Sequence, residues 1–489
     1  MPDNSDNRHV RTKIIATIGP ASAAPQKLDA LCEAGLDVCR INFSHGDHAA
    51  HEAVLSTIRA VGTRRGTPLA VIGDLCGPKI RLGTCGTPVA LAPGARVTLV
   101  AGDAPCTPAC LSVSYPHLAD EVLPGHRVLI DDGLVRLAVR GRRDDALECE
   151  VVVGGVVSSR KGVNLPDSTL SVPALTQKDL LDLDWALTHS VDYIALSFVR
   201  QAEDLYELRR QIKARGHATP VIVKIEKPEA LEHLDELIES SDAVLVARGD
   251  LGVETDLWRV PVVQKDIVAR CRRVGVPVIV ATQMLQTMID NPIPTRAEVS
   301  DVANAVFDQA DAVMLSGETA VGQYPVEAVT MMNRIVAATG QFLAASPPFD
   351  PPPSVAVHYR PTAAVAHAAV QAARDLGVRL VAVWSATGTT VRMVANYRLP
   401  MPILGLTCDE HVQRQMNLLY GVIPVRVPPL DHPAAMVRTL DALVLERRLA
   451  APGDVIVVVT STRPTVAGAT DTALVHRVGA DGVSLLAGV

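Results

Sequence analysis

Charged side chains stand in this sequence where buried apolar segments come to an end. One apolar segment ends in Lys224 and Glu226, and the next in Gly249 and Asp250. A lysine or a carboxylate at the end of a buried strand has to find a partner or a ligand. Because Lys224 and Glu226 are two residues apart, their side chains point to the same face of a strand. They form either a structural ion pair or part of a reactive site.

The two carboxylates suggest which chemistry such a site performs. Glu226 and Asp250 follow neighbouring strands, so two oxygen ligands are expected to face each other. This arrangement suits Mg²⁺ or Mn²⁺, with substrate oxygens completing the octahedron. The Lys224 ammonium beside such a metal is well placed to neutralise a phosphoryl group in transfer. Arg40 and Arg81 can hold further phosphate oxygens in bidentate fashion.

The elements that must position these side chains are continuous apolar runs, which are typical of parallel strands buried on both faces. Each run is followed by a segment with helical periodicity. Eight β-then-α units in series predict a (β/α)8 TIM barrel, and an open doubly wound sheet is the alternative. The runs are residues 13–19, 38–44, 69–75, 193–199, 220–226, 243–250, 277–282 and 312–317.

The third unit is interrupted, and a further α/β pattern follows the barrel. Residues 77–172 contain short Val/Leu runs between glycine and proline turns, which predicts a small inserted β-barrel domain. It acts either as a lid over the barrel mouth or as an insertion without a role. A proline-rich linker at 347–353 leads to a C-terminal doubly wound α/β domain. The predicted domains are 1–76 with 173–345, 77–172, and 346–489.

Composition narrows the function further. The net charge of −7 argues against nucleic acid as a partner. No apolar run is long enough to span a membrane, and the N-terminus lacks the apolar core of a signal peptide, so we expect a cytoplasmic protein with no membrane partner. The nine cysteines contain no C-x-x-C pair, which favours reduced, largely structural thiols over zinc ligands or disulfides.

Seven segments, taken together and in this order, resemble the pyruvate kinase family. They are residues 40–46, 162–166, 222–231, 246–252, 281–285, 294–298 and 314–320. The resemblance extends over residues 10–480 or so and implies the same barrel, inserted lid and C-terminal domain. It also implies phosphoryl transfer from phosphoenolpyruvate to ADP, giving pyruvate and ATP in the final step of glycolysis, and it suggests a homotetramer.

The resemblance assigns roles to individual residues. Lys224 resembles the lysine that stabilises the transferring phosphoryl group, and Thr282 lies where a water that protonates the enolate would be oriented. The implied catalytic residues are Lys224, Thr282 and Arg40; the substrate contacts are Lys224, Gly249, Asp250 and Thr282; the metal ligands are Glu226 and Asp250; and the nucleotide contacts are Arg40, Asn42, His45, Arg81 and Lys161.

One departure from the family pattern concerns K⁺. Members that depend on K⁺ read Asp-Thr-Lys-Gly-Pro-Glu where residues 74–79 read Asp-Leu-Cys-Gly-Pro-Lys. The Lys79 ammonium can supply the charge that K⁺ otherwise brings, and it would repel a bound cation. We therefore predict that K⁺ is not required; the alternative is that Lys79 reaches solvent and K⁺ still binds. The family's K⁺ region maps onto Asn42, Ser44, Asp74 and Leu75, and the first three are the expected partners of Lys79.

The C-terminal domain carries a candidate effector loop, which follows a predicted strand and opens a helix. Hydroxyls, a glycine and a helix N-terminus can cradle a phosphate, and the family places its effector here. We expect a phosphorylated metabolite as allosteric effector; a capped helix without a ligand is the alternative. The loop residues are Ser385, Thr387, Gly388, Thr389 and Thr390.

Two other functions fit parts of the pattern. A barrel lyase or aldolase acting on pyruvate or phosphoenolpyruvate also uses carboxylate-held Mg²⁺ and an enolate, but it rarely carries a lid lysine such as Lys161. A non-catalytic effector-sensing protein on the same fold predicts damage to Lys224, Glu226 or Asp250, and all three are intact.

Overall fold

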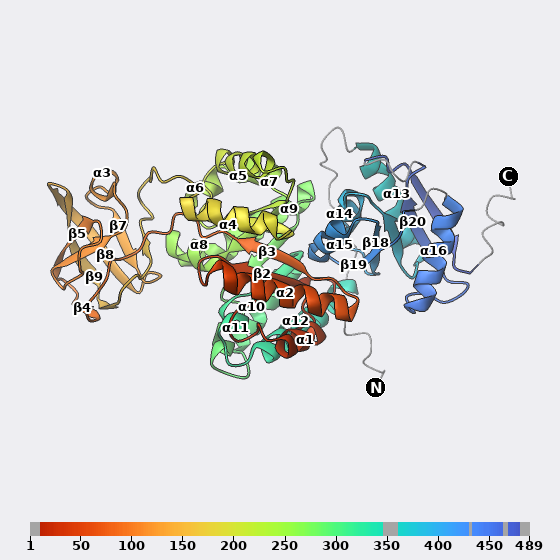
Figure 1. Cartoon of the computed structure of the whole chain (residues 1–489), viewed down its shortest axis with the longest axis horizontal. Coiled ribbons are helices and arrows are strands. Elements are labelled where there is room, and N and C mark those ends of the chain that lie inside the picture. The colour runs from red at the N-terminus through yellow and green to blue at the C-terminus, as the bar shows by residue number, and fades with distance from the viewer. Residues whose placement is uncertain (1–9, 346–359, 430–432, 463–467, 480–489) are drawn as a thin grey trace.

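Three packed parts make up the structure, a computed structural model that describes residues 10–345, 360–429, 433–462 and 468–479. Figure 1 shows a helix-covered barrel in the middle, a small β domain at one end and an α/β domain at the other. The proline-rich segment 347–353, which we predicted to be a linker, lies outside the described residues.

The middle part is a closed barrel of parallel strands, as predicted. The strand order is β1-β16-β15-β14-β13-β12-β3-β2, with β1 and β16 closing the ring. Nearly every strand residue is buried, which explains why the runs are continuously apolar. The strands are β1 (Lys13–Thr17), β2 (Val38–Asn42), β3 (Ala70–Asp74), β12 (Tyr193–Leu196), β13 (Val221–Ile225), β14 (Ala243–Ala247), β15 (Val278–Ala281) and β16 (Ala312–Leu315).

Helices cover the outside of the barrel, and local signals set several of their ends. Capping boxes begin α4 at Thr176 and α10 at Thr295. Helices α1 and α9 end at Gly35 and Gly275, whose φ angles of 113° and 74° favour glycine. Within the described ranges, none of the helices combines the length and the apolar character of a membrane span. The main barrel helices are α1 (Pro25–Ala34), α2 (His48–Arg65), α4 (Gln177–Thr188), α5 (Ala202–Ala214), α9 (Val260–Val274), α10 (Arg296–Phe307) and α12 (Pro325–Ala344).

Two predicted barrel elements differ from the structure. The run at 243–250 ends as a strand at Ala247, because its partner β15 also ends there, with Ala281 opposite. Asp250 therefore lies in the first turn of helix α8 (Arg248–Glu254) and not at a strand end. The segment that follows β13 forms two short helices, α6 (Pro228–Glu232) and α7 (Leu234–Glu239).

The inserted part is a small β domain with its own apolar core. One sheet has the order β11-β7-β8-β9-β5-β6, and β10 pairs separately with β4. Leu99, Leu111 and Leu147 are among its buried residues. The elements are β4 (Val89–Leu91), β5 (Arg96–Ala101), β6 (Cys110–Val113), α3 (Leu118–Glu121), β7 (Arg127–Ile130), β8 (Val135–Arg143), β9 (Ala146–Val153), β10 (Gly155–Val157) and β11 (Val163–Asn164).

The C-terminal part is a five-stranded sheet of order β19-β18-β17-β20-β21, packed against helices. Four strands are parallel, as a doubly wound domain requires, whereas β21 runs antiparallel to β20. The elements are α13 (Arg360–Leu376), β17 (Val381–Trp384), α14 (Thr389–Ala395), β18 (Ile403–Thr407), α15 (Glu410–Gln415), β19 (Val422–Arg426), α16 (Pro433–Glu446), β20 (Val455–Thr460) and β21 (Thr472–Arg477).

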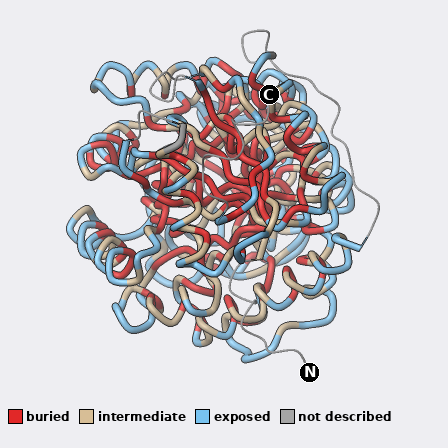
Figure 2. Tube along the Cα trace, turned by 90° about the vertical axis from the view of Figure 1, so that its right-hand side faces the viewer, coloured by how far each residue is buried: buried red, intermediate tan, exposed pale blue. Residues whose placement is uncertain are grey.

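Each part has a main cluster of buried apolar side chains inside one of the predicted domain ranges, and a further cluster joins the barrel strands to Leu418 of the C-terminal part. Figure 2 shows these buried residues gathered in the interior, with exposed residues on the outer turns. The exact domain bounds stay a prediction.

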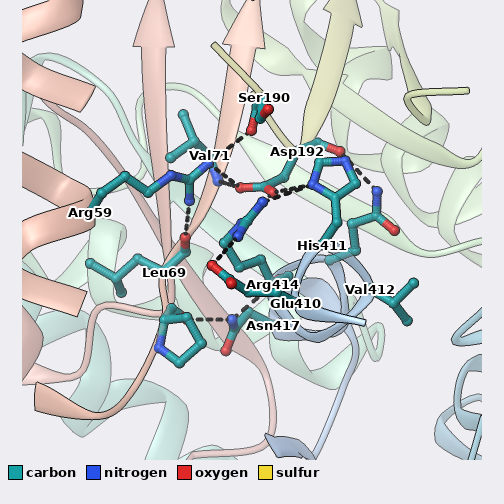
Figure 3. A network of polar contacts seen from close by, with 12 residues as sticks. Arg59, Leu69, Val71, Ser190, Asp192, Glu410, His411, Val412, Arg414 and Asn417 are labelled. Atoms are coloured by element: carbon teal, nitrogen blue, oxygen red, sulfur yellow. Dashed lines mark hydrogen bonds and ion pairs between the residues drawn. The ribbon is translucent and has the colours of Figure 1, made fainter. Parts of the chain in front are cut away.

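A buried carboxylate holds the C-terminal domain against the barrel (Figure 3). Asp192, just before β12, is completely buried. Its Oδ1 accepts a hydrogen bond from Arg414 Nε at 2.7 Å and lies 3.1 Å from His411 Nδ1, and both partners are on α15. Its Oδ2 accepts from the barrel groups Arg59 Nη2 at 3.0 Å and Val71 N at 2.8 Å. Asp192 therefore joins both domains.

The surrounding cations fix the charge of Asp192. Burial raises the pKa of its carboxyl, but His411, Arg59 and Arg414 outweigh burial and hold the pKa below the usual 3.8. A carboxyl with a lowered folded pKa stabilises the fold above its unfolded pKa, and this contribution is lost as pH falls through the folded pKa. The interface should therefore weaken only below about pH 4.

Replacement of Asp192 by asparagine should weaken this interface strongly. Arg59 and Arg414 would lose their buried counter-charge, and Arg414 would keep only the half-exposed Glu410 at 2.8 Å. Breaking a buried pair in this way costs about 3–5 kcal/mol. Denaturant unfolding at neutral pH measures the loss. The control is Asp235→Asn, because the exposed pair of Asp235 with Arg270, at 3.0 Å, is worth at most about 1 kcal/mol. Equal effects of the two substitutions would show that Asp192 does not carry the interface.

Candidate active site

Lys224 stands at the centre of a buried ionic cluster at the carboxyl ends of the barrel strands. Its ammonium lies 2.8 Å from Glu226 Oε1 and 3.4 Å from Asp74 Oδ1, and it donates to Ser197 Oγ at 2.7 Å. Burial lowers the pKa of Lys224, but Asp74 and Glu226 outweigh burial and raise the pKa above its ordinary value. The lysine is therefore a fixed cation at neutral pH.

A second cation shares the Asp74 carboxylate. Arg40, on β2, donates from Nε to Asp74 Oδ2 at 2.7 Å and from Nη1 to Thr17 Oγ1 at 2.9 Å. Asp74 is only 1% exposed. Burial raises its pKa, but Lys224 and Arg40 hold the pKa below the usual value. Asp74 thus positions two cations that can meet one anionic substrate.

The predicted metal ligands fit a divalent cation. Glu226 is fully buried; its Oε2 accepts from Phe198 N at 2.7 Å, and its Oε1 lies 2.8 Å from the Lys224 ammonium. Burial raises the pKa of Glu226 against the effect of Lys224, and the charge of Asp250 raises it further. A cation between the two carboxylates would relieve that repulsion.

Protein ligands alone do not complete such a site. Across the part of the chain that the structure describes, no group of three or more His, Cys, Asp or Glu residues is arranged to hold a metal. Mg²⁺ accepts few protein carboxylates together with substrate oxygens and water. Glu226 and Asp250 therefore suit a metal that arrives with, or is completed by, an oxygen-rich substrate.

The two predicted substrate contacts meet at the ends of β14 and β15. Thr282 Oγ1 accepts from Gly249 N at 2.7 Å and donates to Ala281 O at 2.6 Å. Thr282 and Gln283 have φ angles of 67° and 53°, a conformation that residues other than glycine rarely adopt. Two successive residues of this kind are typical of a functional site, where surrounding structure compensates for the strain.

Cationic side chains predicted to contact the nucleotide gather near His45. Partial shielding from water and the charges of Arg81, Lys79 and Arg40 lower the pKa of His45. Its imidazole is therefore neutral at pH 7, in a region of positive potential. Such a region favours an anionic ligand such as a polyphosphate.

The lid contributes Arg81 and Lys161, which lie on adjoining segments. The backbone of Arg81 pairs with that of Gly162, and Arg81 Nη1 donates to Arg160 O at 3.1 Å. The Lys161 ammonium pairs with Asp131 of the lid at 2.8 Å. Both predicted nucleotide contacts are thus carried together by the lid.

The counter-charge expected for Lys79 is engaged elsewhere. Asp74 binds Arg40 and Lys224, because these two cations project from the buried strands β2 and β13, whereas Lys79 lies in an exposed loop. No ion pair joins Lys79 to a carboxylate in the described ranges. The Lys79 side chain is thus free to face an incoming anion.

The remaining residues of the predicted K⁺ region form local contacts. Asn42 Oδ1 accepts from Ser44 N at 3.1 Å, which shapes the turn after β2. The carbonyl of Leu75 accepts from Ser197 Oγ at 2.7 Å. These contacts neither require nor exclude a monovalent cation.

The predicted effector loop is divided between two environments. Thr387 is exposed, and its hydroxyl lies 3.0 Å from that of Thr389. Thr390 is buried, and its hydroxyl pairs with Thr470 at 2.7 Å. Gly388 precedes α14 with a φ of 76°, and no side chain caps the helix. Ser385 is tied by its backbone N–H to Leu406 O at 2.9 Å.

Two further residues that shape the site had no role assigned to them from the sequence. Ser197 links Lys224 to the Leu75 carbonyl, as described above. Arg248, only 8% exposed, donates to Asp301 Oδ1 at 2.6 Å and to Thr282 O at 2.8 Å, which supports the strained turn. Both follow buried strands, so the strand-end pattern that marked Lys224 also marks them.

Comparison with known proteins agrees with this geometry. The family described as "Pyruvate kinase, barrel domain" matches residues 9–329, and "Pyruvate kinase, alpha/beta domain" matches residues 363–476. The chain belongs to the pyruvate kinase family. It is therefore a phosphotransferase, and the site described above lies where a TIM barrel carries its active site.

Relatives within the pyruvate kinase family resemble the chain over nearly its whole length. A pyruvate kinase from Mycobacterium intracellulare is 43% identical over 97% of this chain and 99% of its own. One from Corynebacterium glutamicum is 42% identical, over 96% and 98%. A crystal structure of a pyruvate kinase from Cryptosporidium parvum superposes with a TM-score of 0.89 at 33% identity, over 97% and 98% of the two chains.

Removal of one carboxylate charge should weaken activation by Mg²⁺. Glu226→Gln and Asp250→Asn each delete an anionic ligand, so the Mg²⁺ concentration for half-maximal rate should rise at least tenfold or so. The control is Glu232→Gln, an exposed carboxylate on α6. Since burial and Asp250 raise the pKa of Glu226, protons should compete with the metal as pH falls. Unchanged Mg²⁺ titrations for both site variants would exclude this metal site.

Proposed function

We propose that this pyruvate kinase family member transfers the phosphoryl group of phosphoenolpyruvate to ADP with the help of Mg²⁺ or Mn²⁺, forming pyruvate and ATP. The observation that carries the proposal is the charged Lys224 ammonium, held by Asp74 and Glu226 at the barrel mouth. An ammonium and an arginine that share one buried carboxylate suit an anion that passes between two acceptors.

Each residue has a distinct part in this scheme. Lys224 and Arg40 stabilise the charge on the phosphoryl group, while His45, Arg81, Lys161 and Asn42 bind ADP. The metal, held by Glu226 and Asp250, supplies electrostatic stabilisation of phosphoryl oxygens when bound. Gly249 and Thr282 bind the substrate.

Protonation of the enolate completes the reaction. A threonine hydroxyl is a poor proton source at neutral pH, so Thr282 orients a water that delivers the proton to the methylene carbon. The strained turn at Thr282 fixes the direction of its hydroxyl.

The decisive experiment separates phosphoryl transfer from enolate protonation. In a coupled assay for pyruvate, Lys224→Met should lower turnover by several orders of magnitude, because the developing charge loses its cation. Ketonisation of added enolpyruvate should suffer less. Lys213→Met, which removes an exposed lysine in the last turn of α5, is the control and should retain activity. Production of pyruvate without ADP would favour the lyase alternative.

K⁺ is a separate question, and we propose that the enzyme works without it. The support is Lys79, whose ammonium contributes to the positive potential at His45. This charge is able to replace that of a monovalent cation.

The test of this proposal is activity in a tetramethylammonium buffer with KCl added stepwise. The response of the unmodified enzyme should be flat, whereas Lys79→Glu should acquire dependence on K⁺. Lys27→Glu, on the exposed side of α1, controls for the change in net charge. A many-fold rise in the rate of the unmodified enzyme would contradict the proposal.

We also propose that a phosphorylated metabolite binds the loop 385–390 and activates the enzyme allosterically. The exposed hydroxyl of Thr387, the neighbouring hydroxyl of Thr389 and the uncapped start of α14 support this. Sugar phosphates or nucleotides should lower the phosphoenolpyruvate concentration that gives half-maximal rate in the unmodified enzyme. In the double variant Thr387→Ala, Thr389→Ala this concentration should not change. Activation that survives in the variant would place the effector elsewhere.

The oligomeric state of the enzyme and its location in the cell are also proposals. Large apolar side chains around the start of α9 are exposed, among them Leu257 at 69%, Trp258 at 76% and Val262 at 69%. A patch of this kind suits burial against a second copy, and we propose a cytoplasmic homotetramer. Sedimentation velocity measures the oligomeric state, and a monomer at assay concentration would contradict it.

A further inference from the structure

Three cysteines of the lid lie on neighbouring segments of its sheet. All nine cysteines of the chain are free thiols. Cys85 and Cys106 are directly paired in a parallel β-bridge, and Cys110 begins β6 four residues after Cys106. No step of the proposed reaction at the barrel mouth uses a thiol, so the catalytic chemistry does not account for this group of cysteines.

The backbone holds Cys85 and Cys106 side by side. Cys106 N donates to Thr84 O at 2.8 Å, which fixes the bridge. Cys85 N donates to Ser159 Oγ at 2.8 Å, and the same hydroxyl donates back to Cys85 O at 3.1 Å. The two side chains therefore start from strands that are already tied together and need no large rearrangement to meet.

The thiols also interact with each other. Burial raises the pKa of Cys85, and the charge and hydrogen bond of Cys106 raise it further. Burial raises the pKa of Cys110, and the charge of Cys106 raises it further, without a hydrogen bond from Cys106. Cys85 is half-buried and Cys106 is buried, so an oxidant reaches Cys85 first and Cys106 is the thiol that lies against it.

We propose that Cys85 and Cys106 form a reversible disulfide, so that the lid carries a site for oxidation by peroxides. The Cys85 thiolate attacks one peroxide oxygen and becomes a sulfenic acid, releasing hydroxide. The Cys106 thiolate then attacks the Cys85 sulfur and displaces the second hydroxide. In sum, two thiols and one peroxide give one disulfide and two waters, and each sulfur loses one electron.

The alternative use of these thiols is a metal site, which the geometry does not favour. Among the residues that the structure describes, the lid cysteines are not part of a group of three or more side chains that could hold a metal. Because the pKa of Cys85 is raised, its thiolate is scarce at neutral pH. Oxidation should therefore be slow at pH 7 and faster at higher pH.

The crosslink would join two segments of the lid that stand next to a predicted ligand contact. Leu82 N donates to Lys161 O at 2.8 Å, so the segment that ends at Cys85 also lies along Lys161. A disulfide fastens this segment to the loop at Cys106 without touching the barrel. It is a modification of the lid, separate from the chemistry on Lys224.

The test is peptide mapping of the full chain after treatment with hydrogen peroxide. The Cys408→Ser background removes the exposed thiol. After residual thiols are alkylated and the protein is digested with trypsin, residues 82–96 should be linked to residues 97–127, and a dithiol reductant should release them. Cys85→Ser and Cys106→Ser should abolish the link, whereas Cys110→Ser is the matched control and should retain it.

Peptide mapping does not depend on catalysis. A missing disulfide would therefore contradict this proposal without bearing on the proposed function. Fragmentation of the linked peptide from enzyme that retains Cys85, Cys106 and Cys110 distinguishes Cys106 from Cys110. This keeps the test valid if a variant does not fold. A link to Cys110 would overturn the proposal. So would Cys85 and Cys106 thiols that stay free when excess peroxide at high pH fully oxidises Cys408 in the unmodified chain.

Discussion

The catalytic end of this barrel depends on keeping an ammonium charged inside a nearly dry interior. Lys224 is only 9% exposed, and a buried charge is tolerated only with matched partners. Asp74 and Glu226 supply the counter-charges, and Ser197 supplies a neutral acceptor. These groups come from β3, β13 and the end of β12, so the ammonium is stable only while the barrel is closed. The closed ring of strands is thus a condition for the chemistry.

Much of the fold could be predicted, because parallel strands buried on both faces leave continuous apolar runs that few other elements produce. The barrel and the C-terminal domain followed from such runs and their spacing, whereas the inserted lid followed from short runs between glycine and proline turns. The exact ends of strands could not be predicted in this way, because a strand ends where its neighbour in the barrel ends. Nothing in the apolar pattern showed that β14 stops at Ala247, because that depends on Ala281 opposite it in β15. Likewise, periodic α/β alternation predicts only parallel strands and cannot show that β21 turns antiparallel.

In the site, the identities of the charged groups were predictable, but their pairing was not. Lys224 and Glu226 share a strand, so their proximity follows from the two-residue spacing. Asp74 comes from another strand, and two cations besides Lys79 compete for it. Arg40 and Lys224 contact Asp74 because they project from buried strands, where an unpaired charge costs most. Proximity in the sequence favours Lys79 as the partner of Asp74, whereas the burial of Arg40 and Lys224 decides which cations pair with it.

The two buried carboxylate clusters at the ends of β12 show how a structural cluster differs from a reactive one. Asp192 and Ser197 are five residues apart, about 16 Å along a strand. Both oxygens of Asp192 accept from protein donors, so that cluster is complete and serves to join two domains. At the other end, the Glu226 carboxylate has one cation, Lys224 at 2.8 Å from Oε1, and the neighbouring Asp250 repels it. Two carboxylates that repel each other are stabilised by a cation that arrives from outside, which is the property that a site for a metal and an anionic substrate requires.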